Sequence, residues 1–191
     1  MPDSYRIGLE LTGNIILNKK INIETNATFS QNRIKNFTEF RDSWDTGGQD
    51  IFEHGTTDLA FSPSLIAYAR LNYNLCKGLI VSLSGKHVGE QFIDNTSNEN
   101  TVLEAYTVGD FQIRYEIKTP FAEKIIFNLL INNIFDNKYS ANAWTYRYTS
   151  EGYDGRGDDP YTRLEGEGVY NLTGFYPQAG RNFLLGVGVR F

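Results

Sequence analysis

Hydrophobic and polar residues alternate with a period of two along several stretches of the chain. The clearest stretch lies at the C-terminal end, where Phe183, Leu185, Val187, Val189 and Phe191 occupy one side and smaller or polar residues occupy the other. This is the period of a β-strand, in which successive side chains point to opposite faces. The sequence therefore predicts a strand that runs to Phe191.

Six further stretches with the same alternation lie upstream. They cover residues 5–11, 21–29, 65–73, 79–86, 106–117 and 124–135. Aromatic and β-branched side chains, which suit a pleated surface, are frequent in these stretches, and turn-forming residues are frequent between them. The pattern predicts an all-β chain with about seven antiparallel strands in one unit, residues 1–191.

The connections between the predicted strands alternate between short and long. Short ones lie near residues 14–20, 74–78 and 118–123, whereas long polar or aromatic loops are expected at residues 31–57, 92–104 and 136–178. Outer-membrane barrels place short turns on the periplasmic side and long loops outside. A soluble sandwich has no reason to sort its connections in this way, so the pattern favours an antiparallel transmembrane β-barrel segment.

The two faces of the predicted strands differ in chemistry. One face is apolar and has aromatic residues near strand ends, such as Tyr73, Tyr115, Phe135 and Phe183. The other face is charged, with Arg70, Lys86, Asp110, Arg114, Glu116 and Arg190. Membrane barrels expose an apolar band with aromatic girdles to lipid and enclose a polar interior. Because charged residues are rarely buried in a dry core, the second face is expected to line a wet interior.

Composition narrows the class of protein further. The chain has 23 acidic and 18 basic residues, a net charge of −5, so it offers no basic surface to nucleic acid. One cysteine and two histidines are too few for a disulfide framework or a histidine-based metal cluster. Serine-histidine-acid groupings and phosphate-binding loops are also lacking. We expect no catalytic residues, no metal, no cofactor and no nucleic-acid partner.

The predicted strands do not make a complete barrel. If Phe191 lies at the periplasmic rim, the alternation of the connections places the start of the first strand outside the cell. A bacterial barrel made from one chain has an even number of strands and both termini in the periplasm. An open sheet in lipid would also leave unpaired backbone groups along two edges. We expect the remaining strands to come from sequence outside this chain or from another chain.

Two segments resemble the end of a known family. Residues 132–139 are Asn-Asn-Ile-Phe-Asp-Asn-Lys-Tyr, and residues 176–183 are Tyr-Pro-Gln-Ala-Gly-Arg-Asn-Phe, followed by the strand that closes on Phe191. They resemble the closing strands of TonB-dependent outer-membrane receptors, in a Bacteroidetes-like form, with Ile134 where leucine is usual. The resemblance is strongest over residues 124–191 and extends over the whole chain.

The resemblance implies a larger barrel of about 22 strands around an N-terminal plug. Residues 1–191 would form the C-terminal part of that barrel, without the plug and the first strands. The implied function is energised uptake of a nutrient, such as an iron chelate, across the bacterial outer membrane. The implied partners are outer-membrane lipid, a small-molecule ligand and the TonB complex, which is contacted through the missing plug. The strand ending at Phe191 resembles the signal that the barrel-assembly machinery recognises.

Ligand recognition in such a receptor is expected on the long external segments. Aromatic rings can stack on a chelate or a sugar, and charged groups can pair with it. The candidate ligand-binding residues are Trp44, Trp144, Tyr146, Arg147, Tyr148, Arg156 and Asp158. Ordinary loop packing is the alternative explanation for each of them.

Two other functions are compatible with the strand pattern. A small passive outer-membrane pore or structural barrel would need an eighth strand, for which residues 169–175 are a candidate. A soluble ligand-binding β-barrel would instead pack its apolar faces against each other under a polar exterior. The motifs mark strand ends, so they do not identify a transported substrate.

Overall fold

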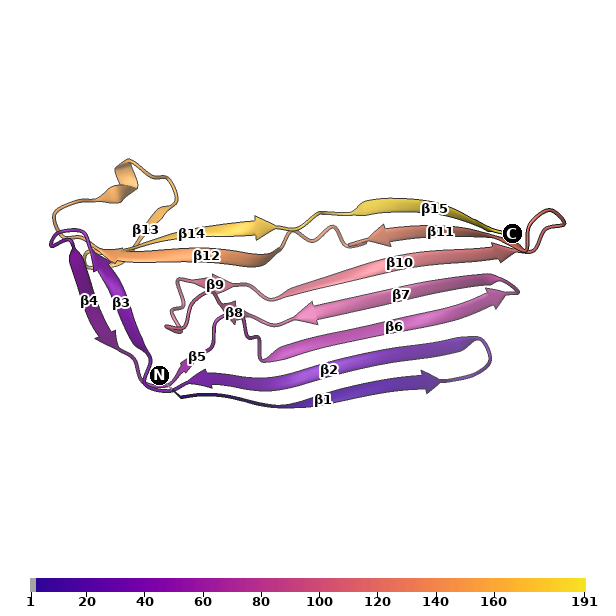
Figure 1. The fold of residues 1–191 in the computed structure, drawn as a ribbon, viewed down its shortest axis with the longest axis horizontal. Helices are drawn as coiled ribbons and strands as arrows, with labels where there is room; N and C mark the ends of the chain where they lie inside the picture. The colour runs from indigo at the N-terminus through magenta and orange to yellow at the C-terminus, as the bar shows by residue number, and fades with distance from the viewer. Residues whose placement is uncertain (1–2) are drawn as a thin grey trace.

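The computed structural model describes residues 3–191, and seven long antiparallel strands dominate it (Figure 1). They form one sheet, the barrel sheet, in which each strand lies next to its predecessor among the seven. The bounds are β1 Ser4–Ile16, β2 Ile21–Ile34, β6 Leu65–Cys76, β7 Leu79–Val88, β10 Tyr106–Ile117, β11 Lys124–Asn132 and β15 Asn182–Arg190. The two-residue strand β5 (Thr57–Asp58) pairs with the end of β2. The predicted all-β fold with about seven antiparallel strands is confirmed.

The remaining regular structure is short or extended. The one helical turn among residues 3–191 is the three-residue 3-10 turn η1 (Gly155–Gly157). None of the helical structure in this part of the chain is long and apolar enough to cross a membrane.

Apolar side chains align in continuous rows across the barrel sheet. One row crosses all seven strands and consists of Ile15, Ile23, Leu71, Leu83, Phe111, Ile131 and Phe183. Side chains on this face are exposed, for example Leu9 at 57% and Leu185 at 77%. Exposed apolar rows suit a sheet whose outer side meets hydrocarbon. The packed apolar faces that a soluble barrel requires do not occur in the barrel sheet.

The opposite face of the barrel sheet carries a polar network. Arg70 donates from Nε to Asn72 at 2.9 Å and from Nη2 to Gln112 at 2.6 Å. Asn72 in turn donates to Glu24 on β2 at 2.8 Å. These hydrogen bonds link side chains of β2, β6 and β10, and such bonds satisfy the polar groups on this face of the sheet.

The connections are sorted by length, as predicted. The short turns after β1, β6 and β10 lie at one end of the barrel sheet together with the C-terminus, and the long connections lie at the other end (Figure 1). Gly78 shows why one short turn needs glycine. Its φ is +82°, and an added Cβ would lie 2.3 Å from the backbone oxygen of Glu116. Both features exclude ordinary L side chains.

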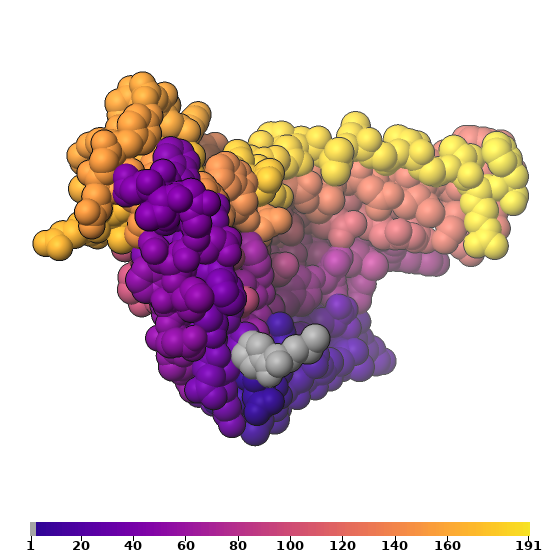
Figure 2. Space-filling view, turned by 60° about the vertical axis from the view of Figure 1, so that its left-hand side comes forward, coloured from indigo at the N-terminus to yellow at the C-terminus, as the bar shows by residue number. Residues whose placement is uncertain are grey.

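The two longest connections are not irregular loops, which corrects the expectation from the sequence. They contain five strands that form a second sheet, the outer sheet, in the order β13-β14-β12-β3-β4. The bounds are β3 Thr38–Ser43, β4 Gly48–Glu53, β12 Ser140–Thr149, β13 Thr162–Gly166 and β14 Val169–Pro177. Figure 2 shows these segments, coloured purple and orange, standing at one end of the barrel sheet.

The stretch considered as an eighth barrel strand belongs to the outer sheet. It lies in β14, which pairs antiparallel with β12 on one side and β13 on the other. Within residues 3–191, it has no partner strand in the barrel sheet. Residues 169–175 therefore do not serve as the eighth barrel strand that the small passive pore would need.

A short hairpin packs against the outer sheet. It consists of β8 (Gln91–Phe92) and β9 (Val102–Leu103) and belongs to the connection between β7 and β10. Ile93 and Leu103 from this connection form a buried cluster with Ala143 of β12. Asn98 also donates a hydrogen bond to Glu165 of β13 at 2.8 Å. These contacts attach the outer sheet to the connection between β7 and β10 of the barrel sheet.

Candidate ligand-binding site

One face of the outer sheet carries a cluster of stacked aromatic rings. Trp44, just after β3, stacks on Tyr148 of β12 with ring centroids 3.9 Å apart, and Tyr148 stacks on Tyr170 of β14 at 5.2 Å. Tyr146 lies 5.9 Å from Tyr148. Tyr148 is fully buried, whereas Trp44 and Tyr146 are 49% and 37% exposed. The cluster thus has a buried floor and two accessible rings.

Hydrogen bonds fix the two accessible rings. Trp44 Nε1 donates to the Tyr146 hydroxyl at 3.1 Å, and that hydroxyl donates to Asp42 at 2.8 Å. Donation by Gln49 and by Tyr146 holds the pKa of Asp42 below its ordinary value. Burial raises the pKa of Tyr146, so its hydroxyl keeps its proton at neutral pH. The two accessible rings are therefore held in place by contacts within the protein.

The accessible surface continues beyond the cluster. Phe40 of β3 pairs with Ile51 of β4, and these side chains are 60% and 62% exposed. Trp144 of β12, 46% exposed, lies over its cross-strand partner Gly174, where an added Cβ would be 2.2 Å from the indole nitrogen. Exposed aromatic rings in a contiguous patch are a common feature of binding surfaces.

The opposite face of the outer sheet holds a buried ion cluster. Arg147 donates to Glu39 at 2.9 Å and to Glu165 at 2.6 Å, Arg41 pairs with Glu39 at 2.9 Å, and His54 Nε2 lies 2.8 Å from Glu39. Burial alone would raise the pKa of Glu39, but hydrogen bonds from Arg41 and His54 and the charge of Arg147 outweigh it, and the pKa is lowered. These charges neutralise one another, so the cluster joins strands and leaves no free cation.

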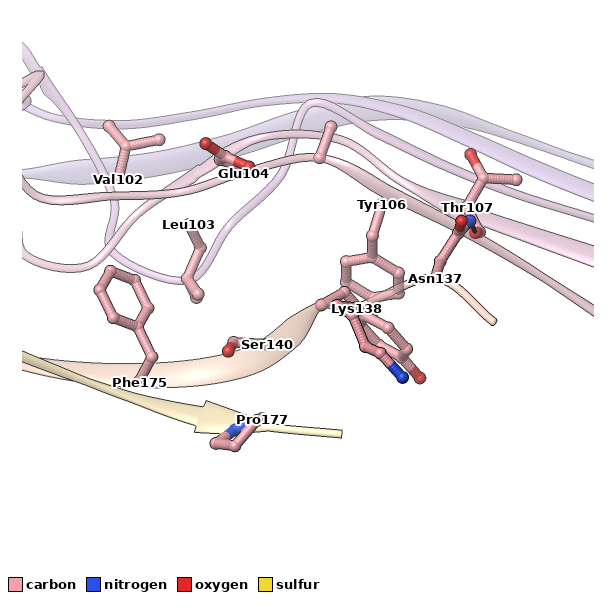
Figure 3. A pocket seen from close by; sticks show the side chains of 12 residues that line it. Val102, Leu103, Glu104, Tyr106, Thr107, Asn137, Lys138, Ser140, Phe175 and Pro177 are labelled. Carbon is pink, nitrogen blue, oxygen red and sulfur yellow. Dashed lines mark hydrogen bonds between the residues drawn. The ribbon is translucent and has the colours of Figure 1, made fainter. Parts of the chain in front are cut away.

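A cavity of about 630 Å³ lies where the outer sheet meets the barrel sheet. Tyr106 of β10 and Tyr139 stack with centroids 4.3 Å apart at one side of it. Figure 3 shows Leu103 and Phe175 facing the same space from opposite sides, with Ser140 below. The lining comes from β9, β10, β12, β14 and the connection before β12, so no local sequence pattern could have indicated it.

The structure brings five of the seven candidate ligand-binding residues to the outer sheet, but not onto one surface. Trp44, Trp144 and Tyr146 lie on its exposed face. Tyr148 forms the floor beneath them, and Arg147 belongs to the ion cluster with a side chain only 13% exposed. Ligand contact by these residues stays a prediction, and the buried position of two of them favours a structural role.

Arg156 and Asp158 lie in and beside the η1 turn, which adjoins the aromatic cluster because the ring of Tyr153 lies 6.1 Å from that of Trp44. Arg156 pairs with Asp154 at 2.6 Å, and hydrogen bonds from Arg156 lower the pKa of Asp154 to about 2. The hydroxyl of Tyr153 donates to Asp158. Nowhere in residues 3–191 do three or more His, Cys, Asp or Glu side chains gather in a way that could hold a metal ion.

Comparisons with known proteins identify the fold. No protein-family model and no curated protein matches the sequence. The closed form of the ferric-catecholate import receptor Fiu from E. coli K12 matches over 100% of this chain, with a TM-score of 0.64 and 17% identity. The siderophore receptor PiuA from Acinetobacter baumannii matches over 92%, with a TM-score of 0.60 and 20% identity. The ferric yersiniabactin uptake receptor FyuA from Yersinia pestis matches over 97%, with a TM-score of 0.58 and 13% identity.

The matched region is a minor part of each of these receptors. The chain covers 21%, 22% and 23% of their respective lengths. Identities at this level establish the fold alone, and the Bacteroidetes-like character of the motifs stays a prediction. The chain thus has the antiparallel β fold of a segment of the siderophore-receptor barrel.

Proposed function

We propose that this chain forms part of the wall and external surface of an outer-membrane receptor that takes up an iron chelate. The observation that carries the proposal is the combination of two sheets in one chain. The barrel sheet has an exposed apolar face and a polar face, and the outer sheet presents fixed aromatic rings at the end with the long connections. The fold likeness to three receptors named for iron chelates supports this choice of substrate class.

The proposal assigns different tasks to the two sheets. The exposed apolar rows of the barrel sheet would contact outer-membrane lipid, and its polar face would line the barrel interior. The outer sheet would give the ligand a pre-formed surface, because binding to side chains that are already ordered avoids part of the entropic cost. The chain itself would supply no chemical step.

Several parts of the proposal rest on the sequence resemblance. These are the position of the chain as the C-terminal part of a barrel, the recognition of its last strand by the barrel-assembly machinery, and energy supply by the TonB complex through a plug. The segments that carry the resemblance, residues 132–139 and 176–191, lie at the end of β11 and around β15.

An uptake experiment tests the function against the passive-pore alternative. Cells that carry or lack the gene would be grown under iron limitation and given iron-55 as a catecholate chelate, with and without a protonophore. Energised uptake predicts accumulation that requires the gene and stops when the proton gradient collapses. Accumulation that continues with the protonophore would favour a passive pore, and accumulation that is independent of the gene would contradict both.

A further inference from the structure

A second, smaller cavity adjoins the one at the sheet junction. It has a volume of about 370 Å³ and is lined by residues that include Asn100, Arg163, Asn171 and Phe175. Phe175 also lines the 630 Å³ cavity, so the two share a wall. Together they form a groove between β14 and the connection that leads into β10, and we call it the β14 groove.

The floor of the β14 groove is one face of β14. Asn171, Thr173, Phe175 and Pro177 alternate along this strand, and all four line one or both of the cavities. Residues two apart on a strand share a face, and six residue steps span about 20 Å. The groove is therefore long enough for an extended organic molecule and has Phe175 at its middle.

The two ends of the β14 groove differ in chemistry. The wide end is walled by Leu103, Tyr106, Tyr139 and Pro177 together with polar residues that include Thr107, Asn137, Lys138 and Ser140, so aromatic and polar groups share its surface. The narrow end contains the guanidinium of Arg163, whose hydrogen bonds go to the backbone oxygens of Pro160 and Thr162. Among residues 3–191, Arg163 makes no ion pair, unlike Arg147 in the neighbouring ion cluster.

The nearby carboxylates do not cancel the charge of Arg163. Glu165 already accepts hydrogen bonds from Arg147, Asn98 and Asn171. Glu104 lines the wide end, but Figure 3 shows its side chain pointing away from the space between Leu103 and Phe175. The groove therefore combines a partly aromatic chamber with one cation, Arg163, that no carboxylate of residues 3–191 neutralises, since Lys138 at the wide end pairs with Asp136.

We infer that the β14 groove binds an organic anion with an aromatic body, the ring lying against Phe175 and the anionic group pairing with Arg163. A guanidinium offers paired N–H donors to a carboxylate, and aromatic rings gain free energy by stacking. The inference rests on the proposed function in one respect: within an uptake receptor, the anion would be an aromatic arm of the imported chelate. The site differs from the exposed rings around Trp44 and Tyr146, which lie on the other face of the outer sheet.

Equilibrium dialysis with carbon-14 salicylate tests the site directly. The protein would be purified in a non-ionic detergent from the membrane in which it assembles, and neutral salicylamide would serve as the uncharged competitor. Each of Phe175→Ala and Arg163→Gln should weaken salicylate binding about tenfold. Phe175→Tyr and Arg163→Lys should retain most of the affinity. Lys77→Gln removes a positive charge from the short turn between β6 and β7, at the other end of the barrel sheet, and should change nothing.

The preference of the groove for the anion over the neutral amide provides the second readout. The wild-type protein should bind salicylate more tightly than salicylamide, and Arg163→Gln should abolish that preference without altering salicylamide binding. The Arg163 side chain is exposed, so this variant carries the test even if Phe175→Ala fails to assemble. Absence of salicylate binding by the wild type, or equal binding by wild type and Arg163→Gln, would overturn the inference.

The outcomes separate the site from the transport function. Energised iron uptake, together with salicylate binding that does not depend on Phe175 and Arg163, would overturn the assignment of the groove and leave the receptor proposal standing. Specific salicylate binding in a protein that takes up no iron chelate would support the groove and overturn the receptor proposal.

Discussion

The guanidinium of Arg147 on β12 donates a hydrogen bond to the carboxylate of Glu39 on β3 at 2.9 Å, although 108 residues separate them in the sequence. The strands that carry them pair in parallel through only two residue pairs, Tyr148 with Asp42 and Thr149 with Ser43. Side-chain contacts therefore supply most of the connection between the two external segments. They make the outer sheet one unit.

Loss of Arg147 should release the two segments from each other. In Arg147→Met, the buried carboxylates of Glu39 and Glu165 lose a shared cation, and such a change costs about 3–5 kcal/mol in buried ion pairs. Hydrogen exchange should accelerate in residues 38–43 and 140–149 but not in β11. Arg156→Met breaks an exposed ion pair with Asp154 and should leave exchange in both strands unchanged. Equal exchange in wild type and Arg147→Met would show that the cluster does not hold the sheet together.

Acid should also weaken the contacts between the segment that contains β3 and the segment that contains β12. The pKa of Glu39 lies below its ordinary value of 4.5, and backbone hydrogen bonds from Glu151 and Gly152 hold the pKa of Asp45 below 3.8. A carboxyl group with a lowered folded-state pKa stabilises the fold above its unfolded pKa and loses that contribution as pH falls through the folded value. The outer sheet should thus keep its full stability from pH 7 down to about 5 and lose the contribution of Glu39 and Asp45 progressively below about 4.5.

The Trp44–Tyr148 stack provides the measurement for the acid effect. Separation of the segments exposes Trp44 to water, so its emission should shift to longer wavelength as pH falls from 5 towards 3. Glu39→Gln and Asp45→Asn should each lower stability at pH 7 and flatten its dependence on pH. A pH profile that is identical in wild type and both variants would contradict the assignment of these carboxyl groups.

The Trp144–Gly174 pair should not tolerate a larger residue at position 174. An added Cβ would lie 2.2 Å from the indole nitrogen, so Gly174→Ala must displace Trp144, and overpacking of this kind costs about 1–3 kcal/mol. In a Trp44→Phe background, Trp144 is the one tryptophan left in the chain. Its emission should shift in Gly174→Ala. Gly186→Ala is the control, because an added Cβ there meets nothing within 4 Å, and it should shift nothing.

The barrel sheet was predictable because apolar residues alternate with polar or small residues along each of its strands. Leu9, Leu71 and Leu185 lie on the exposed apolar face and alternate with polar or small residues, so period-two alternation and connection length located the seven strands. The outer sheet breaks the usual relation between polarity and burial. In β3, Arg41 is 6% exposed and the adjacent Phe40 is 60% exposed, because the partners of Arg41 form a buried ion cluster. The outer sheet also depends on pairing between distant segments, which a local pattern cannot reveal.

The candidate site was predictable only in part, for a related reason. The abundance of aromatic residues drew attention to the two long connections, and the structure places Trp44 and Tyr146 within hydrogen-bonding distance. Composition could not distinguish the buried Tyr148 from the exposed Trp144, since burial depends on which strands pair. The sequence did not single out Phe175 or Arg163, because the cavities that they line are formed by segments more than 50 residues apart.

A paired substitution on β11 tests the orientation of the barrel sheet. Leu129 lies in an apolar row between Ile113 and Leu185, whereas the adjacent Asn128 lies between Arg114 and Gly186 on the polar face. An arginine facing lipid at the middle of a membrane strand costs about 2–4 kcal/mol, whereas one facing the interior is tolerated. Leu129→Arg should therefore reduce the amount of folded protein in the membrane, measured by heat-modifiable gel migration, and Asn128→Arg should leave it near the wild-type amount. The reverse order would place the apolar rows inside the barrel, and equal amounts would show that neither face meets lipid.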